Sequence, residues 1–307
     1  MKGTVIKSTG SWYEVRTPDG QTLSCRLKGI FKLEESKITN PIAVGDKVEI
    51  SREEKGEHTW IIRKIFPREN YIIRKAIKKA EHSHLLAANI DQVVVMATVT
   101  LPRTSLGFID RVLVTAEAYR IPAMVIWNKS DILKEKDRRK VNFFMEQYKK
   151  TGYPIRLISA QDPKDVKAMR SVFQDKVNLL VGHSGVGKST LMNQLIPGLN
   201  QKTAEVSTFA NKGVHTTTFA EMFVMDNQSF IIDTPGIKEL GLSEIYDEEL
   251  SHYFPEMRAL FGECKFHNCT HIHEPQCAVI ELVEMGEIPE SRYLSYLSMF
   301  KEEDNRR

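Results

Sequence analysis

The chain has 307 residues, of which 41% are hydrophobic and 27% are charged, a composition typical of a water-soluble globular protein. This length suffices for two or three domains, each with a core of its own. No apolar run approaches the ~20 residues of a membrane-spanning helix, and the first residues lack the apolar stretch of a secretory signal. We therefore expect a cytoplasmic protein that has no membrane partner.

The net charge of +3 is spread unevenly along the chain. Residues 1–80 carry 17 Lys and Arg against 10 Asp and Glu (net +7), residues 81–240 carry 20 against 16 (net +4), and residues 241–307 carry 6 against 14 (net −8). A basic front and an acidic tail indicate separate modules. The basic front could attract nucleic acid, although a solvated surface of moderate charge explains it almost as well.

Residues 1–67 contain short runs rich in β-branched and aromatic residues, as expected of an all-β domain. The five predicted strands are 4–8, 12–17, 22–27, 44–50 and 58–66. Five short strands predict a small closed barrel of the OB type, and an SH3-like barrel would give much the same pattern. The rings of Trp12, Tyr13 and Trp60 could stack on RNA bases or belong to the core.

Residues 68–80 form a basic segment that we interpret as a linker. Its four clustered cations are Arg74, Lys75, Lys78 and Lys79. Charge alone does not decide between an RNA contact and a solvated connector.

Residues 81–240 alternate apolar strands with helices, the pattern of an α/β domain with a parallel-type sheet covered on both faces. The predicted strands are 92–99, 123–128, 155–160, 177–182, 219–225 and 229–233. Helices are predicted at 108–119, at 137–150 and from Lys188 onward.

The stretch "GHSGVGKST", Gly182 to Thr190, fits the phosphate-loop pattern G-x-x-x-x-G-K-[ST] after a strand and before a helix. Its glycines let successive backbone N–H groups turn toward phosphate oxygens, and the following helix N-terminus adds positive charge. Lys188 should reach the β- and γ-phosphates, and Ser189 should coordinate Mg²⁺.

Other short motifs follow the predicted strands. In "DTPG" (233–236), Asp233 would approach Mg²⁺ through water and the N–H of Gly236 would bind the γ-phosphate. In "NKSD" (128–131), the carboxylate of Asp131 can accept hydrogen bonds from the N1–H and N2–H₂ donors of guanine, a pair that adenine lacks. Further guanine contacts are assigned to Asn128 and Lys129, which would brace and cover the base, and to the backbone N–H of Ala160 in "ISA" (158–160).

The stretch "GVHTTT" (213–218) has the composition of a switch I loop. We choose Thr217 as the Mg²⁺ ligand and γ-phosphate sensor, with Thr216 or Thr218 as alternatives. Many GTPases orient the attacking water with a Gln directly after switch II, but Ile237 occupies that position here, so intrinsic turnover should be slow. We hypothesise that His215 positions the water instead; otherwise it is an ordinary polar loop residue.

The guanine-reading motif precedes the phosphate loop by more than fifty residues, the reverse of the usual order. A sheet requires paired strands and not one particular connection, so nearby termini allow the cut in the chain to move. The order therefore predicts a circularly permuted GTPase domain.

The acidic tail contains Cys264, Cys269, His271 and Cys277 in the spacing C-x₄-C-x-H-x₅-C. Three thiolates and one imidazole make a closed tetrahedral Zn²⁺ site, which should be structural because no position remains for water. His267 and His273 are alternative ligands. Helices are predicted at 278–285 and 291–301, and Cys25 is expected to be an ordinary strand residue.

These motifs in this order, together with "AANIDQVVVMA" (87–97), resemble the bacterial ribosome small subunit-dependent GTPase A family, RsgA, also known as YjeQ or YloQ. The resemblance covers essentially the whole chain and favours His271 as the zinc ligand. It implies an assembly factor that acts late in maturation of the small ribosomal subunit and whose GTP hydrolysis is stimulated by that subunit.

We thus expect a multidomain protein with an N-terminal OB-type barrel (1–67), a basic linker (68–80), a central circularly permuted α/β P-loop GTPase domain (81–240) and a helical zinc-binding domain (241–307). The expected partners are GTP or GDP, Mg²⁺, one Zn²⁺, and the rRNA and proteins of the small subunit, bound by a monomer. A GTP-gated RNA-binding scaffold is the alternative, and a DNA-directed NTPase is disfavoured because Asp131 selects guanine.

The site residues predicted from the sequence fall into four groups. The catalytic group is His215, Lys188 and Thr217. The magnesium group is Ser189, Thr217 and Asp233. The zinc group is Cys264, Cys269, His271 and Cys277. The GTP-binding group is Asn128, Lys129, Ser130, Asp131, Ser159, Ala160, Gly182, His183, Ser184, Gly185, Val186, Gly187, Lys188, Ser189, Thr190, Asp233 and Gly236.

Overall fold

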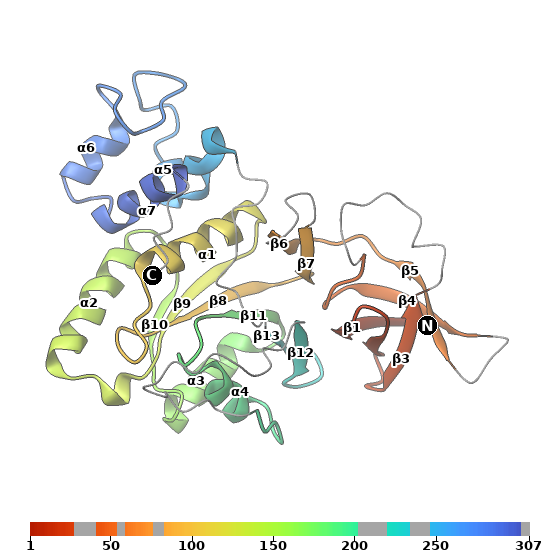
Figure 1. Cartoon of the computed structure of the whole chain (residues 1–307). Coiled ribbons are helices and arrows are strands. Elements are labelled where there is room, and N and C mark those ends of the chain that lie inside the picture. Colours follow the sequence, from red (N-terminus) through yellow and green to blue (C-terminus); the bar gives the residue numbers. More distant parts are fainter. Residues whose placement is uncertain (28–40, 54–58, 76–82, 202–219, 234–245, 302–307) are drawn as a thin grey trace, which may run out of the picture.

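The structure is a computed structural model in which a small barrel, a central α/β domain and a group of C-terminal helices follow one another (Figure 1). It describes residues 1–27, 41–53, 59–75, 83–201, 220–233 and 246–301. Within these ranges, no helix combines the length and apolar character needed to cross a membrane.

The first five strands close into a barrel. They are β1 (Lys2–Ser8), β2 (Tyr13–Arg16), β3 (Thr22–Leu27), β4 (Lys47–Arg52) and β5 (Trp60–Ile65), in the order β1-β2-β3-β5-β4, and β4 pairs back onto β1. Alternate residues such as Val5, Val15 and Ile50 point inward and are fully buried, as period-2 patterning requires. The expected OB-type barrel is confirmed, and Cys25 and Tyr13 belong to its core.

The segment expected to be a linker is partly ordered into a hairpin. Strand β6 (Tyr71–Lys75) pairs antiparallel with β7 (Ser83–Ala88). The apolar residues Ile72 and Ile73 of β6 are buried, which stabilises the hairpin. Arg68 is also structural, since its guanidinium binds both carboxylate oxygens of buried Asp46 at 2.7 and 2.8 Å. Residues 76–82, with two of the four clustered cations, lie outside the described residues.

Two seams attach the barrel to the central domain. At one, β1 pairs with β12 (Glu221–Val224), and Lys7 forms a 2.8 Å ion pair with Glu221. At the other, the N–H of Ala88 donates to the carbonyl of Val44 at 2.9 Å. Gly45 follows with φ +92°, and a Cβ there would lie 2.0 Å from the oxygen of Ala88, so only glycine permits this approach.

The central sheet is parallel except at one strand. Strands β8 (Gln92–Ala97), β9 (Ala123–Trp127), β10 (Ile155–Leu157), β11 (Val177–Val181) and β13 (Phe230–Asp233) run parallel in the order β10-β9-β8-β11-β13, and β12 is antiparallel to β13. Along β8, Val93 and Val95 pack into one core while Val94 and Met96 pack into the other, so the sheet is buried on both faces.

Helices cover both faces of the sheet (Figure 1). The helices are α1 (Leu106–Ala118) and α2 (Glu135–Lys149) on one face, and α3 (Pro163–Phe173) and α4 (Lys188–Leu195) on the other. Helix α1 begins where the hydroxyl of Ser105 accepts a hydrogen bond from the N–H of Phe108. Helix α3, which the sequence analysis did not predict, begins with Asp162 as its N-cap and a proline in its first turn.

The chain reverses its direction across the sheet beside β8. From β8 it moves outward through β9 to β10, then crosses by α3 to β11 on the other side. Loops after parallel strands meet at the carboxyl edge, and ligands bind where the strand order reverses. The loops after β9, β10 and β11, which carry the "NKSD", "ISA" and phosphate-loop motifs, lie at that edge, and so does Asp233 at the end of β13.

The C-terminal elements pack on the α1 side of the central domain (Figure 1). They are η4 (Asp247–Tyr253), α5 (Pro255–Arg258), α6 (Ala278–Glu284) and α7 (Glu290–Phe300). Val114 of α1 enters their apolar core beside Phe254, Tyr296 and Met299. Helix α1 therefore serves both the central domain and the C-terminal helices.

A buried charged cluster lies at the same contact. Arg292 of α7, which is 0% exposed, donates to Asp110 of α1 at 2.8 Å and to Glu256 of α5 at 2.7 Å. The hydroxyl of Tyr148 donates to Asp110 at 2.6 Å, and the ring of Phe254 lies 4.6 Å from the guanidinium. One cation therefore holds carboxylates from two helices in a region closed to water.

We predict that Arg292→Met loosens α7 strongly, because it leaves two buried carboxylates without their cation. Breaking a buried pair in this way costs about 3–5 kcal/mol, whereas Arg139→Met, which removes an exposed pair with Glu135 on α2, should cost less than about 1 kcal/mol. The measurement is the free energy of opening of α7 from amide hydrogen exchange. Equal, small losses for the two variants would contradict the proposed importance of the cluster.

Candidate nucleotide site and metal centre

The phosphate-loop sequence connects β11 to α4 at the centre of the carboxyl edge. Gly187 caps α4 with φ +104°, and a Cβ there would lie 2.3 Å from the side-chain nitrogen of Asn128. A Cβ on Gly182 would lie 2.4 Å from the carbonyl oxygen of Met96. Both motif glycines are required because the loop approaches the ends of neighbouring strands so closely.

The side chain of Asn128 joins three loops. It is 3% exposed; its Nδ2 donates to the carbonyl of Val186 in the phosphate loop at 2.8 Å, and its Oδ1 accepts from the N–H of Ala160 at 2.9 Å. Its own backbone N–H donates to the carbonyl of Ala97 at the end of β8. The "NKSD", "ISA" and phosphate-loop motifs therefore form one continuous site.

The rest of the "NKSD" motif faces the same edge. Lys129 has the left-handed φ of 69°, and its ammonium donates to the carbonyl of Leu101 in the loop after β8. Burial lowers the pKa of Lys129, and the nearby carboxylate of Asp131 opposes that shift. The N–H of Ser130 donates to the carbonyl of Ile158 at 3.0 Å, and Asp131 is exposed within the short helix η2 (Ser130–Ile132).

The "ISA" loop is fixed by side chains. The N–H of Ser159 donates to the carboxylate of Asp165 in the first turn of α3 at 2.8 Å, and the hydroxyl of Ser159 accepts from the N–H of Gln161. The sequence assigned the N–H of Ala160 to guanine O6. In this structure that N–H donates to the side-chain oxygen of Asn128 at 2.9 Å.

Lys188 and Asp233 lie close together beneath the phosphate loop. The ammonium of Lys188 donates to the carbonyls of Gly182 at 2.6 Å and His183 at 3.2 Å. Burial lowers the pKa of Lys188, and the negative charge of Asp233, at the end of β13, opposes that shift. A half-buried cation that lies inside its own loop is placed to compensate an incoming phosphate.

The remaining phosphate-loop residues lie around this cation. Ser184 is exposed, Gly185 has φ +82°, and Val186 is fully buried. Ser189 and Thr190 lie in the first turn of α4 and are half-buried. The ring of His183 packs 4.0 Å, centroid to centroid, from the ring of Phe108 on α1.

Several predicted residues lie outside the described residues. They are His215, Thr217, Gly236, the alternatives Thr216 and Thr218, and Ile237. Their roles stay predictions from the sequence.

Cys264, Cys269, His271 and Cys277 converge as predicted, with all four ligand atoms within 4.8 Å of one another. The Sγ atoms of Cys264 and Cys277 are 3.9 Å apart, and Nδ1 of His271 lies 3.6 and 3.4 Å from them. A tetrahedral Zn²⁺ with ordinary bond lengths requires about 3.8 Å between sulfurs and about 3.6 Å between sulfur and nitrogen. The tetrad therefore fits one structural zinc, and the exposed His267 and His273 lie outside it.

Helix α7 supports the loop that carries these ligands. The hydroxyl of Tyr293 donates to the carbonyl of His271 at 2.8 Å, and that of Tyr296 donates to the carbonyl of Thr270 at 2.6 Å. The carboxylate of Glu274 accepts from both the N–H and the hydroxyl of Thr270. Metal ligands held by such neighbours keep their orientation.

Sequence reasoning missed Phe108, Asp165 and the cluster around Arg292. One signal was available: Asp110 interrupts the otherwise apolar face of the predicted helix 108–119, and a carboxylate in such a position requires a partner. The partner itself lies 182 residues away in sequence, so the pairing could not be foreseen.

Comparison with known proteins agrees with this geometry. The sequence model described as RsgA GTPase matches residues 65–243, and the one described as RsgA N-terminal domain matches residues 2–61. The chain belongs to the RsgA GTPase family. The predicted permuted GTPase architecture, with its OB-type barrel, is thereby confirmed.

Relatives match this RsgA-family chain over its whole length. "Small ribosomal subunit biogenesis GTPase RsgA 2" of Bacteroides thetaiotaomicron is 49% identical, covering 99% of this chain and 97% of its own. "Small ribosomal subunit biogenesis GTPase RsgA" of Cytophaga hutchinsonii is 47% identical over all of both chains. Among solved structures, YjeQ from Thermotoga maritima is similar with a TM-score of 0.78 at 35% identity, covering 100% of this chain and 99% of that one. The structure described as "YloQ, a circularly permuted GTPase" is similar with a TM-score of 0.74 at 29% sequence identity, and the match covers 100% of this chain and 96% of that one.

We predict that the purified protein holds one zinc ion and that His271→Ala loses it. Without the ion, nothing joins the remaining ligands across the small C-terminal core, so this core opens and α7 should lose its protection from hydrogen exchange. Elemental analysis gives the zinc content, and His273→Ala is the matched control, which should keep one zinc per chain. Zinc retained by His271→Ala but lost from His273→Ala would contradict the ligand assignment.

Proposed function

We propose that this RsgA-family chain is a GTP-hydrolysing assembly factor that acts late in maturation of the small ribosomal subunit. It binds the subunit in the GTP state and leaves after subunit-stimulated hydrolysis. The single observation that carries the GTPase part is the side chain of Asn128, which ties the guanine-type loops to the phosphate loop. The relatives named as small ribosomal subunit biogenesis GTPases support the assignment of the partner.

Guanine selectivity rests on the loops after β9 and β10. The exposed carboxylate of Asp131 accepts from the two adjacent donors of the base, while Asn128, Lys129 and Ser130 hold the loop in place. The buried pair Ser159 and Ala160 forms the second wall of the base site. A carboxylate at this position discriminates against adenine, which offers no matching pair of donors.

Phosphate binding rests on the loop from Gly182 to Thr190. On nucleotide binding, the ammonium of Lys188 exchanges its bonds to backbone carbonyls for bonds to phosphate oxygens. Ser189, Thr217 and Asp233 would hold Mg²⁺, which neutralises charge on the phosphates. Gly236 would contribute a backbone N–H to the γ-phosphate.

Hydrolysis requires an oriented water molecule. Ile237 follows the switch II glycine and has no polar atom in its side chain, so the chain alone should turn over slowly. We assign the orienting role to His215 in switch I when the subunit is bound, and we expect Thr217 to contact the γ-phosphate at the same time.

We assign a different function to each of the three parts of the chain. The basic barrel (1–67) and the basic segment (68–80) contact rRNA, the central domain (81–240) carries the GTP cycle, and the acidic zinc-containing tail (241–307) contacts ribosomal proteins. We propose that the protein works as a cytoplasmic monomer, since each nucleotide motif comes from a single chain.

We predict that Asp131→Asn weakens GTP binding about 100-fold, since it replaces two charge-assisted hydrogen bonds with a repulsive donor–donor contact worth about 3 kcal/mol. The amide should in turn favour xanthosine triphosphate, whose C2 carbonyl accepts its N–H. Titration calorimetry with GTP and with xanthosine triphosphate measures both affinities. Asp137→Asn in the first turn of α2 is the control and should bind like the wild type; equal GTP affinity in both variants would contradict the assignment of the base site.

We predict that purified small subunits increase multiple-turnover GTP hydrolysis at least tenfold, whereas large subunits and free RNA do not. His215→Ala should abolish the stimulation while GTP binding stays intact. Near-normal stimulated turnover in that variant would eliminate His215. No stimulation of the wild type would favour a GTP-gated scaffold over an enzyme that must hydrolyse.

A further inference from the structure

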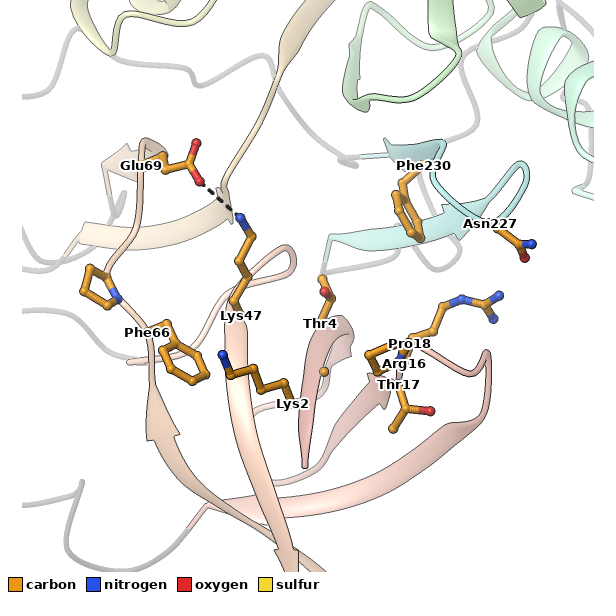
Figure 2. A pocket seen from close by; sticks show the side chains of 12 residues that line it. Lys2, Thr4, Arg16, Thr17, Pro18, Lys47, Phe66, Glu69, Asn227 and Phe230 are labelled. Atoms are coloured by element: carbon orange, nitrogen blue, oxygen red, sulfur yellow. Dashed lines mark hydrogen bonds and ion pairs between the residues drawn. The ribbon is translucent and has the colours of Figure 1, made fainter.

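A cleft of about 480 Å³ lies between the barrel and the edge of the central sheet, away from the nucleotide loops (Figure 2). Its barrel wall comes from β1, the end of β2, the start of β4 and the segment after β5. Its opposite wall comes from Asn227, between β12 and β13, and from Phe230, the first residue of β13. Its volume is in the range of sites that bind small molecules.

The cleft is preformed, because both seams that attach the barrel to the central domain hold its walls. On one side, β1 supplies Thr4 to the cleft and, further along, pairs with β12 at Lys7. On the other side, Lys47 follows the loop of Gly45, which docks on Ala88. A ligand that enters therefore need not pay for bringing the two domains together.

Positive charge dominates the lining. Lys2, Arg16 and Lys47 line the cleft together with a single carboxylate, Glu69, which forms a 3.1 Å ion pair with Lys47. The ammonium of Lys2 lies 5.2 Å from the ring centre of Phe66, and the guanidinium of Arg16 donates to the carbonyl of Gly20 at 3.1 Å. This excess of cations suits a ligand that carries negative charge.

Aromatic and polar groups complete the lining. Phe66 from the barrel and Phe230 from β13 lie on opposite sides of the cleft, with Thr4 and Lys47 between them in Figure 2. Both rings are half-buried, so a face or edge remains open to a ligand. A base can stack on such a ring, while hydroxyl and amide groups such as Thr4 and Asn227 bind a ribose or a base edge.

We propose that this cleft binds one nucleotide unit of single-stranded RNA, with its phosphate at either Lys2 or Arg16 and its base against Phe66 or Phe230. The chemistry is that of a nucleoside monophosphate, and an RNA strand is the source that the basic barrel favours. This ligand is distinct from GTP, so the inference adds a second site to the proposed function.

The position of Phe230 gives this site a route to the GTP site. Phe230 is the first residue of β13, and the same strand ends at Asp233 beside Lys188. Asn178 of β11 also donates to the carbonyl of Phe230 at 2.9 Å, which ties the start of β13 to the strand that leads into the phosphate loop. RNA in the cleft thus touches an element shared with the nucleotide site.

Another surface of the barrel competes for the same ligand. OB-type barrels commonly bind nucleic acid over strands 2 and 3 and the loop between strands 1 and 2. Here Trp12 in that loop stacks on Arg26 of β3, with the guanidinium 4.1 Å from the ring centre. A test must therefore separate the cleft from this face.

The test uses the full-length protein with GDP and a fluorescently labelled uridine hexamer at about 150 mM salt, where the Debye length is about 8 Å. The double variant Lys2→Glu/Arg16→Glu changes the cleft, and Arg26→Glu/Arg63→Glu makes the same charge change on exposed barrel residues outside it. We expect the cleft variant to bind the hexamer at least tenfold more weakly and to reduce the slope of log affinity against log salt by about 0.7, the value for one phosphate on a single strand. The control variant should lose about threefold or less, and both should keep wild-type affinity for GDP.

Unlabelled uridine monophosphate distinguishes the sources of the ligand. Displacement of the hexamer at millimolar concentration supports binding of free nucleotides as well, and no displacement supports the strand alone. Equal losses in both double variants, or no binding of the hexamer by the wild type, would overturn the proposal. Intact GDP binding in the cleft variant would keep the proposed GTPase function separate from that result.

Discussion

The nucleotide site depends on two hydrogen bonds made by the buried side-chain amide of Asn128. Its donor end fixes the carbonyl of Val186 in the phosphate loop, and its acceptor end fixes the N–H of Ala160 in the second guanine-type loop. An uncharged amide can donate at one end and accept at the other, whereas aspartate or leucine at this position would leave a buried partner unsatisfied. Position 187 requires glycine because a Cβ there would lie 2.3 Å from the side-chain nitrogen of Asn128.

This bridge explains how a permuted chain can keep one site. Three parallel strands bring their carboxyl ends to one edge whichever of them comes first in the sequence, and Asn128 then joins their loops side by side. In sequence order, the "DTPG" motif (233–236) comes directly before the C-terminal region (241–307). The C-terminal helices rest on α1, through the buried pair of Arg292 and Asp110, and α1 touches the phosphate loop through Phe108 and His183. The zinc-bearing helices are therefore in physical contact with the element that flanks the nucleotide.

Hydrophobic patterns and motif spacing in the sequence predicted much of the fold and of the site. The barrel strands, the parallel sheet and the convergence of the zinc tetrad follow from local patterning and from short ligand spacings. The hairpin of β6 and β7 was missed because the four clustered cations at residues 74–79 suggested a linker, although Ile72 and Ile73 are buried. The Arg292 cluster was missed because its partners are far apart in sequence. The hydrogen bond from the N–H of Ala160 to Asn128 was missed because the acceptor comes from another loop. Patterns reveal which face of an element is buried, but not which distant polar group meets it there.

The most direct test of a single permuted site is a crystal structure of the full chain with bound GDP. The account predicts that the guanine edge lies within hydrogen-bonding distance of the Asp131 carboxylate while the β-phosphate lies in the loop from Gly182 to Thr190, with the bridge from Asn128 to Val186 retained. A nucleotide whose phosphates occupy that loop while its base lies away from Asp131 would contradict it.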